Sequence, residues 1–86
     1  MKTVTIYTME YCPYCENAKR LLASKSIPYK EIKVSLDDEP EWDRLEKLTG
    51  YKTMPQIFID EHFVGGYREL TAIEQSGELD KLLSSS

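Results

Sequence analysis

The two cysteines of the chain lie three residues apart, in Cys12-Pro13-Tyr14-Cys15, and they are the only cysteines among its 86 residues. An alternating apolar segment precedes them and an amphipathic segment follows, so the first thiol stands where a helix is expected to begin. Unpaired backbone N–H groups and the positive end of the helix dipole stabilise a thiolate there, and the thiolate is the form that attacks disulfides. The spacing predicts a strand that leads into a helix, with thiol–disulfide exchange at the junction.

Metal binding and a purely structural disulfide are weaker interpretations of the same pair. A closed zinc site needs four ligands, and His62 is the only histidine that can join the two sulfurs. A bridge that closes so short a loop constrains the unfolded chain little. We therefore predict a redox pair without a metal, and we assign His62 no role.

Composition limits the class of protein. With 86 residues and 41% hydrophobic content, residues 1–86 are expected to form one domain around a single core. A net charge of −4 without a basic run does not favour nucleic acid as a partner. No segment has the length of a membrane span or the pattern of a signal peptide. We expect a monomeric cytoplasmic protein with no membrane partner.

The periodicity of apolar residues switches between strand and helix along the chain. Three consecutive apolar residues, Ile57, Phe58 and Ile59, indicate a central strand that is covered on both faces. In the second helix we expect Trp42, Leu45 and Leu48 to point inward, with Asp38 or Glu39 as the cap and Gly50 at the end. The predicted strands are residues 3–8, 28–34, 56–60 and 63–64, and the predicted helices are residues 13–25, 38–48, 69–76 and 78–83, before a frayed serine tail.

This order of elements predicts an α/β protein. A right-handed crossover joins the first two strands as a parallel pair, and the last two strands form an antiparallel hairpin. The sheet is therefore expected to be mixed and four-stranded, with helices on both faces.

Three motifs together carry a resemblance to a known family. Tyr7-Thr8 followed by Cys12-Pro13-Tyr14-Cys15, then Thr53-Met54-Pro55-Gln56-Ile57-Phe58-Ile59, then Gly65-Gly66, at these separations, resemble a dithiol glutaredoxin over nearly the whole chain. The resemblance implies a thioredoxin-like fold in which the Met54–Pro55 bond is cis and faces the disulfide. It also implies a glutathione-dependent thiol–disulfide oxidoreductase that reduces protein disulfides and glutathione mixed disulfides, with glutathione as co-substrate and no tightly bound cofactor.

The two cysteines are expected to differ in role. Cys12, at the helix start, is predicted to be exposed and acidified, with a pKa below the ordinary ~8.5 of a free thiol. Cys15 is one turn deeper on the apolar stripe with Ala18 and Leu22, so it should be buried and protonated. Cys12 therefore attacks and Cys15 resolves. Lys19 is expected to be mainly an ordinary surface residue.

By the same resemblance, residues from three segments would hold the substrate. Where the family commonly carries a lysine three residues before the first cysteine, this chain has Met9, and in place of two acids after the glycine pair it has Arg68 and Glu69. We expect Lys52 to supply the missing charge, Arg68 to pair with the γ-glutamyl carboxylate and Glu69 to hold the γ-glutamyl amine. The predicted substrate-binding residues are Tyr14, Lys52, Thr53, Met54, Pro55, Gly66, Tyr67, Arg68 and Glu69.

Two alternatives remain open at the level of sequence. Met9 and Arg68 favour a glutaredoxin-like electron donor that is recharged by a thioredoxin reductase instead of glutathione. A different class is an iron–sulfur cluster carrier, in which Cys12 and glutathione hold a cluster between two protomers. Pro13 disfavours the carrier, because cluster-binding members of the family usually have a smaller or less rigid residue there.

Overall fold

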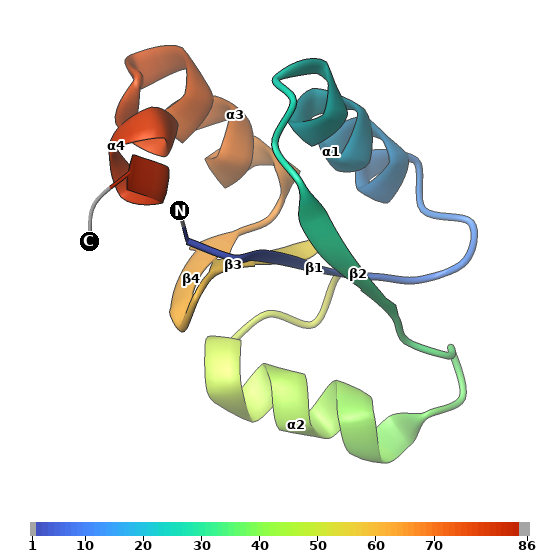
Figure 1. Cartoon of the computed structure of the whole chain (residues 1–86). Coiled ribbons are helices and arrows are strands. Elements are labelled where there is room, and N and C mark those ends of the chain that lie inside the picture. The colour runs from blue at the N-terminus through green and yellow to red at the C-terminus, as the bar shows by residue number, and fades with distance from the viewer. Residues whose placement is uncertain (1, 85–86) are drawn as a thin grey trace.

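A computed structural model describes residues 2–84 of the chain. Its sheet has four strands in the order β2-β1-β3-β4 (Figure 1). Strand β1 pairs parallel with β2 and antiparallel with β3, and β3 pairs antiparallel with β4. The strands are β1 (Val4–Thr8), β2 (Tyr29–Lys33), β3 (Gln56–Ile59) and β4 (His62–Gly65). The predicted mixed four-stranded sheet is confirmed.

Helices cover both faces of this sheet, as predicted. Helix α2 lies on one face, and α1, α3 and α4 lie on the other (Figure 1). The helices are α1 (Pro13–Ser24), α2 (Glu39–Thr49), α3 (Tyr67–Ser76) and α4 (Glu78–Ser84). Within residues 2–84, no helix is long and apolar enough to cross a membrane. Ser84 is the last residue of α4, and the rest of the predicted serine tail lies outside the described residues.

The ends of α2 follow the predicted local signals. Asp38 is the N-cap, and its Oδ1 accepts a hydrogen bond from the Glu41 N–H at 3.3 Å. Gly50 ends the helix in the left-handed conformation, at φ 82°, which favours glycine. The Gly50 N–H donates to the Glu46 carbonyl at 2.7 Å, so one of the last carbonyls of the helix is satisfied.

Helix α3 begins two residues earlier than predicted, at Tyr67 instead of Glu69. Gly66 is extended and serves as the N-cap, and its N–H donates to Glu69 Oε1 at 2.8 Å. This is one half of a capping box, in which an acid at the third helical position reaches back to the cap. Tyr67, Arg68 and Glu69 therefore form the first turn of α3 and not a preceding loop.

Two clusters of buried apolar side chains hold the layers together, and we call them the aliphatic cluster and the sulfur cluster. The aliphatic cluster lies between the sheet and α1, α3 and α4, and it consists of Val4, Ile6, Ala18, Leu22, Ile27, Ile57, Ile59, Leu70, Leu79 and Leu83. The sulfur cluster contains both cysteines, and it consists of Cys12, Cys15, Val34, Leu45 and Met54. The sequence predicted a single core. The structure has two separate clusters, and the sequence analysis did not predict the sulfur cluster as a separate one.

The prediction that Leu48 points inward is wrong, since this side chain is 61% exposed. Trp42 is half-buried against the sulfur cluster and Leu45 is fully buried, as expected. One turn further, Thr49 continues the inward stripe, and its hydroxyl donates to Gln56 Oε1 at 3.0 Å. Because Leu48 is rotated by about 100° from Thr49 around the helix axis, it faces water.

The topology brings four chain segments together at one end of the sheet, where β1 and β2 end. Parallel pairing places the ends of β1 and β2 together, where Thr8 is opposite Lys33. Antiparallel pairing brings the start of β3 and the end of β4 to the same end of the sheet, because Tyr7 is opposite Gln56 and Ile57 is opposite Gly65. The loops before α1, after β2, before β3 and before α3 therefore lie side by side.

Candidate active site

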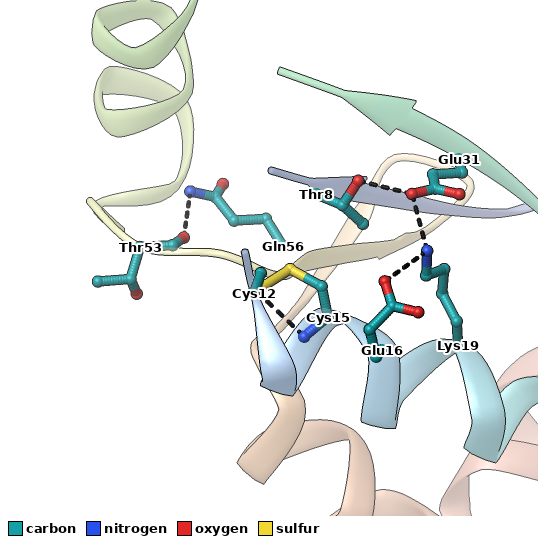
Figure 2. The surroundings of a disulfide bond; sticks show 8 residues. All are labelled: Thr8, Cys12, Cys15, Glu16, Lys19, Glu31, Thr53 and Gln56. Carbon is teal, nitrogen blue, oxygen red and sulfur yellow. Dashed lines mark hydrogen bonds and ion pairs between the residues drawn. A yellow bond between two sulfur atoms is a disulfide. The ribbon is translucent and has the colours of Figure 1, made fainter. Parts of the chain in front are cut away.

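The cysteine pair sits at the start of α1 and forms a disulfide with a Cα–Cα distance of 5.2 Å (Figure 2). Cys12 is the N-cap, with extended backbone, and its Sγ accepts a hydrogen bond from the Cys15 N–H at 3.1 Å. Pro13 begins the helix, where a missing N–H costs no hydrogen bond. The Cys15 N–H and the start of α1 thus lie beside the Cys12 sulfur.

The prediction that Cys12 is exposed is wrong for this oxidised state, since Cys12 is 7% exposed and Cys15 is fully buried. The disulfide joins the Cys12 sulfur to a buried partner, and both residues pack with Met54 in the sulfur cluster. The order of burial is as expected, because Cys12 is the more accessible of the two. An attacking thiol therefore reaches Cys12 before Cys15.

Lys19, one turn beyond Cys15, is not the ordinary surface residue that was expected. Its ammonium lies 2.9 Å from Glu16 Oε2 and 3.1 Å from Glu31 Oε2 (Figure 2). The Thr8 hydroxyl donates to Glu31 at 2.7 Å and, ahead of the contact with Lys19, holds the pKa of this carboxyl below its ordinary value. Two carboxylates thus balance the charge of Lys19, and the start of α1 remains the source of positive potential at the cysteines.

A groove of about 470 Å³ lies next to the disulfide on the β3 and β4 side of the sheet. Tyr14 and Met54 connect the two, since Tyr14 lies between the cysteines in sequence and Met54 packs in the sulfur cluster. The Met54–Pro55 peptide bond is cis, as the resemblance implied. The groove is lined by Tyr14, Tyr51, Thr53, Met54, Pro55, Gly66, Tyr67, Arg68, Glu69 and Thr71.

The structure thus brings eight of the nine predicted substrate-binding residues to one groove. Aromatic side chains form one wall of it, where the rings of Tyr14 and Tyr67 stack with centroids 6.0 Å apart. The exception is Lys52, whose Nζ lies 3.7 Å from Glu46 Oε2 and whose side chain is mostly exposed. A contact of Lys52 with substrate therefore stays a prediction.

Arg68 and Glu69 are neighbours in the groove with different surroundings. The Gly66 N–H donates to Glu69 and, as the main cause, holds the pKa of this carboxyl below its ordinary value. Burial first, and then the charge of Glu69, raise the pKa of Tyr51. Arg68 is exposed and makes no ion pair with any residue in the range 2–84. Arg68 is thus the cationic side chain that the groove offers to a ligand.

Gly65 is required by the position of Glu69. Its φ is +127°, and a Cβ at this position would lie 2.7 Å from Glu69 Cγ. Such an approach is closer than van der Waals contact allows, so a larger residue would displace the capping carboxylate. The glycine pair of the sequence therefore has a steric role at its first member.

Gln56 is a site residue that the sequence analysis missed. The side chain is fully buried at the start of β3. Its Nε2 donates to the Tyr51 carbonyl at 3.2 Å and to the Thr53 carbonyl at 3.1 Å, and Figure 2 shows the second of these bonds. The Thr49 hydroxyl donates a hydrogen bond to Gln56 Oε1. One buried amide thus fastens the loop that carries the groove wall. The available signal was an amide next to three apolar residues in a strand predicted to be covered on both faces.

Comparison with known proteins connects this geometry to a family. A family model described as Glutaredoxin matches residues 4–64. Glutaredoxin 1 of Rickettsia typhi is 48% identical over 86 residues, which is 99% of this chain and 83% of that protein. The solution structure of glutaredoxin from Brucella melitensis superposes with a TM-score of 0.83 at 44% identity, over 96% of this chain and 89% of that one.

A further solved structure is the crystal structure of a buckwheat glutaredoxin–glutathione complex. It superposes with a TM-score of 0.88 at 25% identity, over 96% of this chain and 77% of that one. These neighbours are glutaredoxins with a thioredoxin-like fold, so the predicted fold class is confirmed.

Proposed function

The chain belongs to the glutaredoxin family of thiol–disulfide oxidoreductases, and on this premise we propose that it reduces protein disulfides and glutathione mixed disulfides with electrons from glutathione. The observation that carries the proposal is the groove beside Cys12, which contains the loop from Thr53 to Pro55 and an arginine, Arg68, that makes no ion pair with the described residues. We further propose that the protein works in the cytoplasm, where a Cys-x-x-Cys pair serves catalysis more often than structure.

The chemistry follows from the placement of the two sulfurs. The Cys12 thiolate attacks one sulfur of the substrate disulfide, a Cys12–substrate bond forms, and the other substrate sulfur leaves as a thiolate that takes up a proton. Cys15 then attacks the Cys12 sulfur, loses its proton, and releases the second substrate thiol. The product is a Cys12–Cys15 disulfide and a substrate dithiol.

Two molecules of glutathione regenerate the dithiol. The first attacks Cys12 and forms a glutathionyl–Cys12 bond, with Cys15 as the leaving thiol. The second attacks the sulfur of the bound glutathione, so that oxidised glutathione leaves and Cys12 is again a thiolate. In this scheme the glutathionyl group lies in the groove while it is bonded to Cys12.

The groove offers matching partners for a peptide that carries carboxylates. Arg68 is positioned for a charge-assisted hydrogen bond to a glutathione carboxylate. Glu69, whose Oε1 accepts from the Gly66 N–H, is the carboxylate that the groove offers to the γ-glutamyl amine. The buckwheat glutaredoxin in complex with glutathione is a relative in fold that supports this choice of co-substrate.

Reduction of the oxidised protein by two donors tests the proposal. Glutathione with glutathione reductase and NADPH should reduce it with saturable kinetics, and thioredoxin reductase with NADPH should be slower. Faster reduction by thioredoxin reductase, without saturation by glutathione, would reject glutathione as the donor. A visible absorption spectrum of protein purified without air addresses the iron–sulfur carrier, because bound cluster gives strong sulfur-to-iron bands.

The role of Arg68 has a direct kinetic test. Arg68→Glu should raise KM for glutathione about tenfold with little change in kcat, since the contact is remote from the reacting sulfur. Lys81→Glu is the matched control, because it reverses a charge on α4, outside the groove lining. Equal KM changes in both variants would show that only overall charge matters.

A further inference from the structure

The strand order places the disulfide between two grooves. Cys12 follows β1, which has β2 on one side and β3 on the other. The groove described above uses the loops next to β3 and β4. A second groove of about 490 Å³ lies on the β2 side, and we call it the acidic groove. It is lined by Glu10, Lys33, Val34, Ser35, Leu36 and Asp37.

The acidic groove lies close to the reacting centre. Glu10 precedes Cys12 by two residues, and Val34 packs in the sulfur cluster with Cys12 and Cys15. Figure 1 shows the segment before α1 and the segment after β2 leaving the same end of the sheet. A molecule bonded to Cys12 can therefore extend into this groove as well as into the first.

The wall of the acidic groove is held in place by hydrogen bonds. The Val34 N–H donates to the Thr8 carbonyl at 2.8 Å, and the Asp38 N–H donates to the Ser35 carbonyl at 3.1 Å. The indole N–H of Trp42 also donates to the Ser35 carbonyl, at 2.9 Å. The segment after β2 is thus joined to β1 and to α2 and closed by one internal hydrogen bond, so the groove exists before a partner arrives.

Apolar side chains border this groove although they face water. Leu36 is 57% exposed, and Tyr11, which adjoins Glu10, is 90% exposed. Tyr11 has a φ of 57°, in the left-handed region that a bulky residue rarely adopts. Leu36 therefore offers apolar surface to a partner beside the charged residues of the groove.

Negative charge dominates the groove. Glu10 makes no ion pair with any residue in the described part of the chain, and Asp37 accepts a hydrogen bond only from the Ser35 hydroxyl. Lys33 is the one cation in the lining, and Asp38 and Glu39 follow directly in sequence. A partner of complementary character carries positive charge next to an apolar side chain.

We propose that the acidic groove binds the segment of a protein substrate next to its reactive cysteine, and that it favours a basic and apolar segment. The inference rests on the proposed reduction of protein disulfides but not on glutathione as the donor. Glutathione is short enough to occupy the first groove alone, whereas a protein chain bonded to Cys12 continues on both sides of its cysteine. The acidic groove therefore selects among protein substrates.

Single-turnover reduction of synthetic peptide disulfides tests the proposal without glutathione. The protein is reduced with dithiothreitol, freed of it, and mixed with disulfide-linked dimers of either Leu-Lys-Cys-Lys-Leu or Leu-Glu-Cys-Glu-Leu. Each rate is divided by the rate with hydroxyethyl disulfide, an uncharged small substrate, which corrects for any change in the reactivity of Cys12 itself. Because the assay contains no glutathione, it can still be interpreted if glutathione turns out not to be the electron donor.

Charge reversal at the groove should change which peptide is preferred. Glu10→Lys should lower the normalised rate for the lysine peptide about threefold to tenfold and raise it for the glutamate peptide. The control Glu61→Lys makes the same change at the β3–β4 turn, at the opposite end of the sheet from Cys12, and should leave both rates unchanged. Equal effects of Glu10→Lys and Glu61→Lys, or no peptide preference in the unmodified protein, would overturn the proposal.

The apolar part of the surface has its own matched pair. Leu36→Ser should slow both peptides about threefold relative to hydroxyethyl disulfide, because both present leucines. Leu48→Ser removes an equally exposed leucine from α2, outside the acidic groove, and should have no effect. The proposal is wrong if the two leucine variants behave alike.

Discussion

The aliphatic cluster and the sulfur cluster divide stability and chemistry between two parts of a small molecule. The first joins three helices to one face of the sheet through aliphatic side chains and an alanine. The second has half as many buried residues, and three of them, Cys12, Cys15 and Met54, carry sulfur. Burial of apolar area stabilises a fold in proportion to that area, so the larger cluster should carry most of the stability.

The smaller cluster is suited to a different task. Its members come from the start of α1, the residue after β2, helix α2 and the loop before β3. These segments lie near the end of the sheet where the grooves are. Changes in oxidation state of the cysteines therefore occur away from the main packing interface. The comparison predicts that substitutions in the sulfur cluster alter reactivity first, and that those in the aliphatic cluster alter stability first.

The largest expected effect is on the nucleophile of the sulfur cluster. Cys12→Ser should lower turnover of a glutathionylated peptide by about 10³-fold or more, because no attacking thiol remains in reach. Cys15→Ser should retain this activity, since removal of glutathione needs only the attacking thiol. Thermal unfolding of the reduced variants should stay close to that of the reduced wild type. An active Cys12→Ser variant with an inactive Cys15→Ser variant would reverse the assigned roles.

The converse experiment addresses the aliphatic cluster. Leu70→Ala, at the fully buried fourth residue of α3, should lower the free energy of unfolding by about 2 to 4 kcal/mol through lost burial and a cavity. Denaturant titration measures this change. Activity per folded molecule at low temperature should be nearly unchanged. A large loss of activity in the folded fraction would show that the two clusters are not independent.

Gln56 lies at the boundary between the two regions. Gln56→Met keeps the length of the side chain but leaves the carbonyls of Tyr51 and Thr53 without this donor, and the loss of the two hydrogen bonds should cost about 1 to 3 kcal/mol in total. We expect KM for a glutathionylated peptide to rise more than kcat falls, because the loop loses position while the thiols do not.

Thr49 supplies the control for the role of Gln56. Thr49→Ser keeps the hydroxyl that donates to Gln56 Oε1, and Thr49→Val removes it at nearly equal volume. The serine variant should keep the wild-type KM, and the valine variant should resemble Gln56→Met. If all three variants share one KM, Gln56 serves stability alone.

The smallest effect is expected at Glu69, which belongs both to α3 and to the groove. Its pKa is lowered in the folded protein, mainly by the hydrogen bond from the Gly66 N–H. A lowered folded pKa means that its contribution to stability is complete above the pKa of the unfolded carboxyl and is lost as the pH falls through the folded value. Glu69→Gln should cost about 0.5 to 1 kcal/mol at neutral pH and less in acid. A difference in unfolding free energy that does not shrink as the pH falls would contradict the capping role.

The sequence by itself determined the features that depend on near neighbours. Cys12 and Cys15 in a Cys-x-x-Cys pair at a helix start identify thiol chemistry whatever the rest of the chain does. Asp38 and Gly50 fix the two ends of α2 through hydrogen bonds within four residues. Alternation and the run from Ile57 to Ile59 identified the strands, because side-chain direction in a strand depends only on position.

Only the tertiary structure decided which residues share an environment. Gln56 became a positioning residue because β3 is buried on both faces and α2 brings Thr49 to it. Lys52 pairs with Glu46, outside the groove lining. Leu48 faces water, although its helical spacing suggested otherwise. The strand order placed one groove on each side of the disulfide. Such outcomes depend on register and on packing between segments far apart in sequence, and one sequence read locally carries no measure of these.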